Sequence, residues 1–207
     1  MSVRLQATRA LTPILKQEGS LASTLPAQLE NLPDNEHPLL RELCYGTLRF
    51  LPRLQLIAAE LMPKALKRKD QDIQALILLG LYQLGYTRIA AHAAISETVQ
   101  VTAKLKKPWA KGLINGILRN FQRRAAELTS RLETQPEFQH AHPAWLIGKL
   151  SKAWPDQAAE IMAQNNQQAP LTLRVNCRLI ERHAYAQQLQ QAGIDFDLCP
   201  FSEDGIS

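Results

Sequence analysis

The sequence predicts a mainly α fold followed by a small α/β region, and two observations support this division. Apolar residues recur every three or four positions through the first 125 residues, which is typical of amphipathic helices. The charge also changes sign, because residues 1–125 hold 18 Lys and Arg against 9 Asp and Glu, whereas residues 126–207 hold 6 against 10. We therefore predict an all-helical domain at residues 1–126 and a small α/β domain at residues 127–207.

The first predicted helix spans residues 3–16 and places apolar side chains on one face. Arg4 and Arg9 belong to the opposite, polar face, and Pro13 is expected to kink or shorten the helix. A short helix at residues 21–32 follows, and a proline ends it.

The next part of the chain predicts a central helix and its neighbours. In residues 38–62, Pro52 favours two helices or one kinked helix. Residues 70–84 are apolar almost all the way round, which is typical of a helix in the middle of a bundle. Two further helices are predicted at residues 92–105 and 108–124.

The second domain has a different pattern. Two short helices are predicted at residues 143–152 and 155–165, each opened by a proline. Residues 171–176 alternate between apolar and polar and predict the first strand. A helix at residues 182–192 and a second strand at residues 194–198 would complete a βαβ-like piece.

The sequence offers no enzyme active site of its own. It contains no glycine-rich GxG loop, no GxSxG and no HExxH, so we predict no catalytic and no cofactor-binding residues. His140 and His142 have a spacing that could bind a metal, but a solvated turn is the favoured interpretation, and we predict no metal site. Cys177 and Cys199 are predicted to be inert thiols.

The cysteines and the apolar runs also indicate the cellular compartment of the protein. The three cysteines show no CxxC spacing, which favours a reducing cytosol. The longest apolar run, residues 75–82, is far shorter than the ~18 residues that a membrane span requires. We therefore predict a cytoplasmic protein with no membrane partner.

The basic residues predict a polyanion partner for the first domain. In residues 111–124 one helix face is apolar, while polar and basic residues recur every four positions on another face. The alternative, a simple solvated face, has similar weight for this one helix. The three tryptophans are interpreted as packing anchors. The predicted RNA-binding residues are Arg4, Arg9, Lys104, Lys106, Lys107, Lys111, Asn115, Arg119 and Arg123.

Several motifs resemble a known family. Four segments resemble the NusB-like all-helical RNA-binding fold, namely residues 40–49, 81–89, 92–97 and 111–119. Together with three later motifs, their order and spacing resemble the bacterial 16S rRNA cytosine-5 methyltransferases of the RsmB (Sun or Fmu) family. These later motifs are His142–Leu146, Asn165–Asn166 and Leu173–Asn176. The resemblance covers roughly residues 4–198.

The resemblance implies a function as well as a fold. Family members continue into a Rossmann-like domain with a glycine-rich S-adenosylmethionine loop and two catalytic cysteines, one of them in a Pro-Cys motif. Here Cys199-Pro200 has the reverse order, so no catalytic role is transferred to it. The resemblance implies a truncated, RNA-binding N-terminal region that positions 16S rRNA and is inactive alone. The methyltransferase domain would act in cis or in trans, and the full-length family would use S-adenosylmethionine.

A second hypothesis remains open. The helical domain could be a NusB-like module for protein–protein and RNA contacts in transcription regulation. Gly112 and Gly116, four residues apart, would let a partner helix or a phosphate backbone come close.

Overall fold

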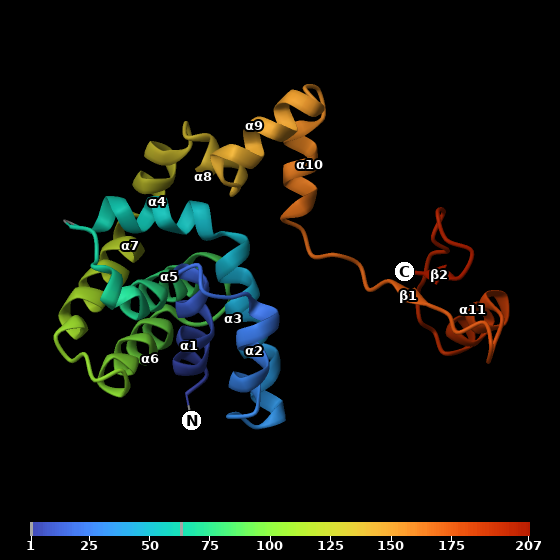
Figure 1. Cartoon of the computed structure of the whole chain (residues 1–207), viewed down its shortest axis with the longest axis horizontal. Coiled ribbons are helices and arrows are strands. Elements are labelled where there is room, and N and C mark those ends of the chain that lie inside the picture. The colour runs from blue at the N-terminus through green and yellow to red at the C-terminus, as the bar shows by residue number, and fades with distance from the viewer. Residues whose placement is uncertain (1, 63) are drawn as a thin grey trace. The chain divides into compact units, whose positions relative to one another are not determined.

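The computed structural model describes residues 2–62 and 64–207. The chain divides into two compact units, Met1–Asn166 and Gln167–Ser207, which we name the helical unit and the small unit. Figure 1 labels their elements. Within the described residues, no helix combines the length and the apolar character needed to cross a membrane.

The helical unit consists of ten α-helices and two short 3₁₀ helices among its described residues. Their bounds are α1 (Val3–Leu15), α2 (Leu21–Leu29), η1 (Asp34–Glu36), α3 (His37–Arg49), α4 (Leu51–Leu61), η2 (Arg68–Asp70), α5 (Gln71–Tyr86), α6 (Ala91–Lys104), α7 (Ala110–Leu132), α8 (Pro136–His140), α9 (Ala144–Ala153) and α10 (Ala158–Asn165).

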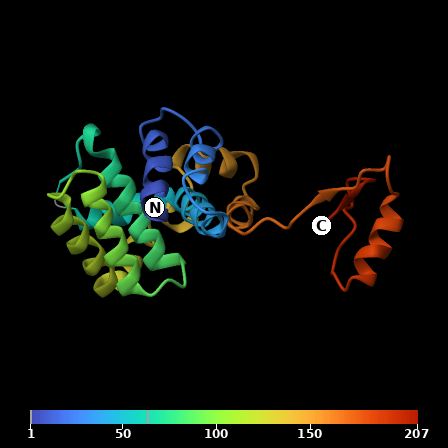
Figure 2. The ribbon, with the colours of Figure 1, turned by 90° about the horizontal axis from the view of Figure 1, so that it is seen from below.

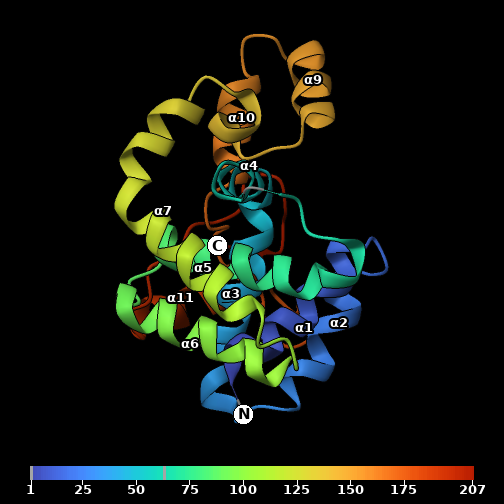
Figure 3. The ribbon, with the colours of Figure 1, turned by 90° about the vertical axis from the view of Figure 1, so that its left-hand side faces the viewer.

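Helix α5 forms the centre of the helical unit. It packs against α1, α3, α4, α6 and α7, and Figure 3 shows these helices gathered around it. Ile73 and every residue from Ala75 to Gln83 are buried, which confirms the prediction of a central helix. Gly80 permits the close packing of α7, because a Cβ atom there would lie 2.7 Å from the methyl carbons of Leu118.

Pro13 and Pro52 lie near helix ends, whereas Pro26 lies inside the short helix α2. Helix α3 ends at Arg49 and α4 begins at Leu51, with Pro52 in the first turn of α4. Proline is well tolerated in a first turn because its missing N–H would have no partner there. Pro13 lies in the last turn of α1, which ends two residues later.

Helix α7 is longer than predicted. It continues past residue 124 to Leu132, through a stretch in which most residues are polar or alanine. Leu128 and Leu132 are 1% and 0% exposed, so the apolar stripe of the helix continues and holds this end against the core. Burial of a few apolar side chains on one face therefore keeps this segment helical, although most of its other residues are polar.

The small unit contains β1 (Leu173–Arg174), α11 (Arg182–Gln191) and β2 (Gly205–Ile206), visible at the red end of the chain in Figure 2. The two strands pair antiparallel, with Leu173 opposite Ile206 and Arg174 opposite Gly205. The predicted first strand and the predicted helix are confirmed, the strand in a shorter form.

The second strand predicted at residues 194–198 is wrong. Leu198 forms an isolated bridge to Ile206, and the backbones of Asp197 and Ser207 exchange hydrogen bonds of 2.7 and 2.9 Å, but the strand that joins β1 is β2. Ile206 is 2% exposed and forms the small core together with Val175 and Ala186. Gly205 lets the backbone pass close to Cys199, whose Cβ atom would lie 2.8 Å from an added Cβ.

Packing places α8, α9 and α10 in the helical unit, because α8 packs on α4 and the three helices pack on one another. The predicted domain limit at residues 126–127 lies inside α7. This boundary between the two predicted domains stays a prediction. The two compact units, by contrast, divide after Asn166.

Candidate nucleic-acid interface

Helix α7 has one buried and one open face. Ile114, Leu118 and Phe121 are at most 7% exposed and pack into the core. Lys111, Arg119 and Arg123 are exposed. Because helix positions four residues apart share a face, these three cations form one row along a rigid helix, with the half-buried Asn115 within it.

The two glycines of α7 leave this face flat. Gly112 and Gly116 are exposed, and a Cβ atom at either position would meet no atom within 4 Å. No part of the described chain therefore uses the close approach that these glycines permit. The space is open to a phosphate backbone or to another helix.

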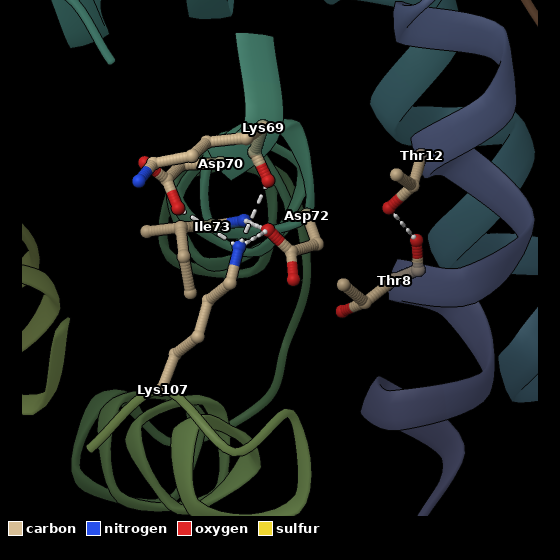
Figure 4. A network of polar contacts seen from close by, with 7 residues as sticks. All are labelled: Thr8, Thr12, Lys69, Asp70, Asp72, Ile73 and Lys107. Carbon is tan, nitrogen blue, oxygen red and sulfur yellow. Dashed lines mark hydrogen bonds and ion pairs between the residues drawn. The ribbon is translucent and has the colours of Figure 1, made fainter. Parts of the chain in front are cut away.

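Lys107 holds the turn between α6 and α7 in place. Its Nζ donates hydrogen bonds to Asp72 Oδ1 at 2.6 Å, to Asp70 Oδ1 at 2.9 Å and to the Lys69 carbonyl at 3.0 Å (Figure 4). Burial alone would lower the pKa of Lys107, but the hydrogen bonds to Asp72 and Asp70 outweigh it and raise this pKa. The ammonium group is thus charged and already occupied, so Lys107 positions the turn rather than facing RNA.

The same turn exposes its other lysines. Lys106 has a left-handed φ of 57°, and its N–H donates to the Ala103 carbonyl at 3.0 Å. This conformation ends α6, and it leaves Lys106 exposed. Lys104, the last residue of α6, is exposed as well.

Arg4 does not face the solvent, contrary to the predicted polar face of the first helix. Its residue is 6% exposed, its Nε donates to Gln83 Oε1 at 2.9 Å, and its guanidinium forms an ion pair with Glu97. Gln83 in turn donates to Thr98 Oγ1 at 3.1 Å. This buried network ties α1 to α5 and α6, so Arg4 is unavailable to a phosphate.

Other basic side chains are also either exposed or held by contacts within the chain. Arg9 is exposed and makes no ion pair among the described residues. Arg53 is occupied instead, because its Nε donates to the Phe138 carbonyl and its NH2 group to the Gln139 carbonyl, the latter at 2.7 Å. Arg124 binds both carboxylate oxygens of Glu127, at 2.8 and 2.9 Å, and thereby lowers the pKa of Glu127.

The tryptophans are not the packing anchors that the sequence suggested. Trp109, Trp145 and Trp154 are 54%, 64% and 52% exposed. Trp109 directly precedes α7, between the exposed Lys106 and Lys111. An exposed indole beside cations is a surface on which an unpaired base can stack.

The histidine pair also differs from its interpretation as a solvated turn. His142 is 7% exposed, and its Nδ1 bonds to the His140 carbonyl at 2.6 Å. Burial, followed by the charges of His142 and Arg53, lowers the pKa of His140. Among residues 2–62 and 64–207, no three His, Cys, Asp or Glu side chains lie close enough together to hold a metal ion.

Cys177 is exposed, but its surroundings do not favour the reactive thiolate. Its thiol donates a hydrogen bond to Asp204 Oδ1 at 2.9 Å. This bond, followed by desolvation and the negative charge of Asp204, raises the pKa of the thiol. Reactive cysteines have the opposite surroundings, because nearby positive charge lowers their pKa.

Two family models match the chain. The NusB family model matches residues 1–123, and the model described as "Methyltr_RsmF/B-like, ferredoxin-like domain" matches residues 142–207. Among solved structures, a crystal structure of PH0851 aligns with a TM-score of 0.64 at 10% identity and covers 98% of this chain and 48% of that protein. At this identity the likeness shows the fold alone.

Several curated proteins called "Ribosomal RNA small subunit methyltransferase B" align with the chain from end to end. The one from Pseudomonas putida is 50% identical over 206 residues, which make up 100% of this chain and 47% of that protein. Relatives from Pseudomonas syringae pv. tomato and Vibrio vulnificus are 48% and 43% identical and are covered to 46% and 48% of their length. The chain thus spans about half the length of the curated relatives it matches. With the NusB model over more than half of its residues and these relatives along all of it, the chain belongs to the NusB family and corresponds to the NusB-like and ferredoxin-like region of RsmB proteins.

Proposed function

We propose that this chain is the RNA-binding N-terminal region of an rRNA (cytosine-5) methyltransferase of the cytoplasm. It positions 16S rRNA for methylation by an S-adenosylmethionine-dependent domain that lies outside these 207 residues and acts in cis or in trans. The relatives called ribosomal RNA small subunit methyltransferase B support the reaction and the substrate class. On this proposal the chain alone transfers no methyl group.

The observation that carries the proposal is the open row of Lys111, Arg119 and Arg123 on α7. None of these side chains makes an ion pair among the described residues, whereas Arg4, Lys107 and other cations are occupied. Exposed cations on a rigid helix suit phosphate contacts, which supply the sequence-independent part of RNA affinity. Arginine adds a bidentate fit to phosphate.

The residues of this chain do not fit an S-adenosylmethionine site. Such sites use a glycine-rich turn between a strand and a helix. The strand β1 is followed by Val175 and Asn176, and no glycine lies between it and α11. We therefore assign the methyl donor to the separate domain.

A salt titration tests the proposal. Binding of the chain to a hairpin from small-subunit rRNA is measured by filter retention at increasing salt. Affinity should fall with salt at a log–log slope of about −0.7 for each single-stranded phosphate contacted. Absent binding, or binding that does not change with salt, would contradict an interface built on phosphate contacts.

One observation favours a second candidate, a NusB-like module for protein contacts in transcription regulation. The open space over Gly112 and Gly116 could receive a partner helix as well as a phosphate backbone. A pull-down with and without nuclease separates the two candidates. Partners that depend on RNA disappear after nuclease, whereas a direct protein partner stays bound.

A further inference from the structure

A pocket of about 600 Å³ opens in the helical unit, away from the row of cations on α7. Its walls come from the start of α2, from α3 and α4, from the segment between α8 and α9, and from the end of α10. None of its lining residues belongs to α7. Pockets of roughly 300–1,000 Å³ are the usual size for small ligands, and a single nucleotide fits this range.

The lining of the pocket combines apolar, aromatic, basic and amide side chains. Leu48, Leu51 and Pro52 supply an apolar part, and no Asp or Glu among the described residues lines the pocket. Tyr45 is 53% exposed and lies on the same wall as Arg49, one helical turn away on α3. The pocket therefore pairs an aromatic ring with a cation and excludes negative side chains.

The end of α10 supplies two amides to the lining, those of Asn165 and Asn166. Asn166 Nδ2 donates to the His140 carbonyl at 2.8 Å, and His142 Nδ1 bonds to the same carbonyl at 2.6 Å. His142 Nε2 then lies 3.5 Å from Asn165 Nδ2, a long contact that leaves much of the donor capacity of Asn165 unused. Gln55 on α4 adds a third amide to the lining.

We propose that this pocket binds one unpaired RNA nucleotide, with the base against Tyr45, the phosphate at Arg49 and the base edge at the amides of Asn165 and Gln55. Single-stranded RNA is recognised in this way, because splayed bases stack on aromatic rings and expose their hydrogen-bonding edges. The inference rests on the proposed RNA-binding function and deepens it. Lys111, Arg119 and Arg123 of α7 contact the RNA backbone, and the pocket recognises one base.

Nucleoside 5′-monophosphates test the pocket directly. Each is titrated into the ¹⁵N-labelled chain, and amide chemical shifts are followed by NMR. Saturable shifts should concentrate on the lining residues, and Arg49→Ala should weaken binding about tenfold, as expected for loss of a charge-assisted hydrogen bond. Arg41→Ala is the matched control, because Arg41 is exposed on the same helix and does not line the pocket.

A second pair of variants separates stacking from folding. Tyr45→Phe retains the ring and should bind like the wild type, whereas Tyr45→Ala should lose affinity. Absent shifts at the lining, or equal binding by the Arg49→Ala and Arg41→Ala variants, would overturn the proposal.

Hairpin binding and nucleotide binding together distinguish failure of the pocket proposal from failure of the proposed RNA-binding function. If the rRNA hairpin binds through α7 while the nucleotides leave the pocket unshifted, the pocket fails and the RNA-binding function stands. If nucleotides bind at the pocket while the hairpin does not bind, the proposed function fails instead.

Discussion

The two units of this chain use their apolar residues in opposite ways. The helical unit buries a continuous core around α5, including Ile73, Leu76 and Leu78 at 0% exposure. The small unit buries only Val175, Ala186 and Ile206, and leaves Phe201 fully exposed. Units near 40 residues rarely build a sufficient core without support. The helical unit should therefore fold independently, whereas the small unit should be the less stable part.

The largest expected effect comes from the core of the helical unit. Leu76→Ala removes a fully buried side chain and should lower the free energy of unfolding by about 2–5 kcal/mol, measured by denaturant titration. Ile206→Ala is the matched change in the small unit, where the residue is 2% exposed. It should speed hydrogen exchange around β1 and leave the main unfolding transition in place. An equal loss in the main transition from both variants would mean that the units unfold together.

The second effect concerns the turn that presents the α7 face. Lys107→Ala leaves Asp70 and Asp72 without their cation and should cost about 1–3 kcal/mol, because the side chains are 21%, 12% and 22% exposed. Lys104→Ala, at an exposed position on the same turn, should cost under about 0.5 kcal/mol. Thermal and denaturant unfolding of both variants measure the difference.

The pH dependence of this difference has a definite sign. Folding raises the pKa of Lys107, so its contribution is fully present below the ordinary lysine value of about 10.4 and is lost as the pH rises through the raised value. The stability gap between wild type and Lys107→Ala should shrink above that pH. A gap that grows with pH would contradict the ion-pair account.

The smallest expected effect compares one thiol from each unit. Burial raises the pKa of Cys44 to about 12, whereas Cys177 is exposed and hydrogen-bonded to Asp204. A thiol reagent at mild pH should label Cys177 before Cys44. Asp204→Ala should speed the labelling of Cys177, because the group that holds its proton is removed. Unchanged labelling of Cys177 in this variant would contradict the hydrogen bond.

The elements that sequence could predict are those encoded by neighbouring residues. The apolar surface of residues 70–84 identified the central helix, and Pro52 marked the break between α3 and α4. The family motifs led to the resemblance that the comparisons confirm.

The elements that could not be predicted depend on distant partners. Arg4 is bonded to Glu97 and Gln83, which lie far away in the sequence. The spacing of residues along α1 alone therefore predicted that Arg4 faces the solvent. Lys107 is occupied by carboxylates at the start of α5 for the same reason. The strand at Gly205–Ile206 is too short for any periodicity to indicate it.

The most direct test of the account compares two variants of equal charge. Lys111→Ala, Arg119→Ala and Arg123→Ala are combined in one chain, and the control combines Lys152→Ala, Arg41→Ala and Arg88→Ala, all exposed positions away from α7. The salt dependence of rRNA hairpin binding is then measured for both. The α7 variant should bind more weakly and lose about 2 from its log–log salt slope, at roughly 0.7 for each lost phosphate contact, while the control keeps the wild-type slope. Equal slopes for the two variants would contradict an RNA interface on α7.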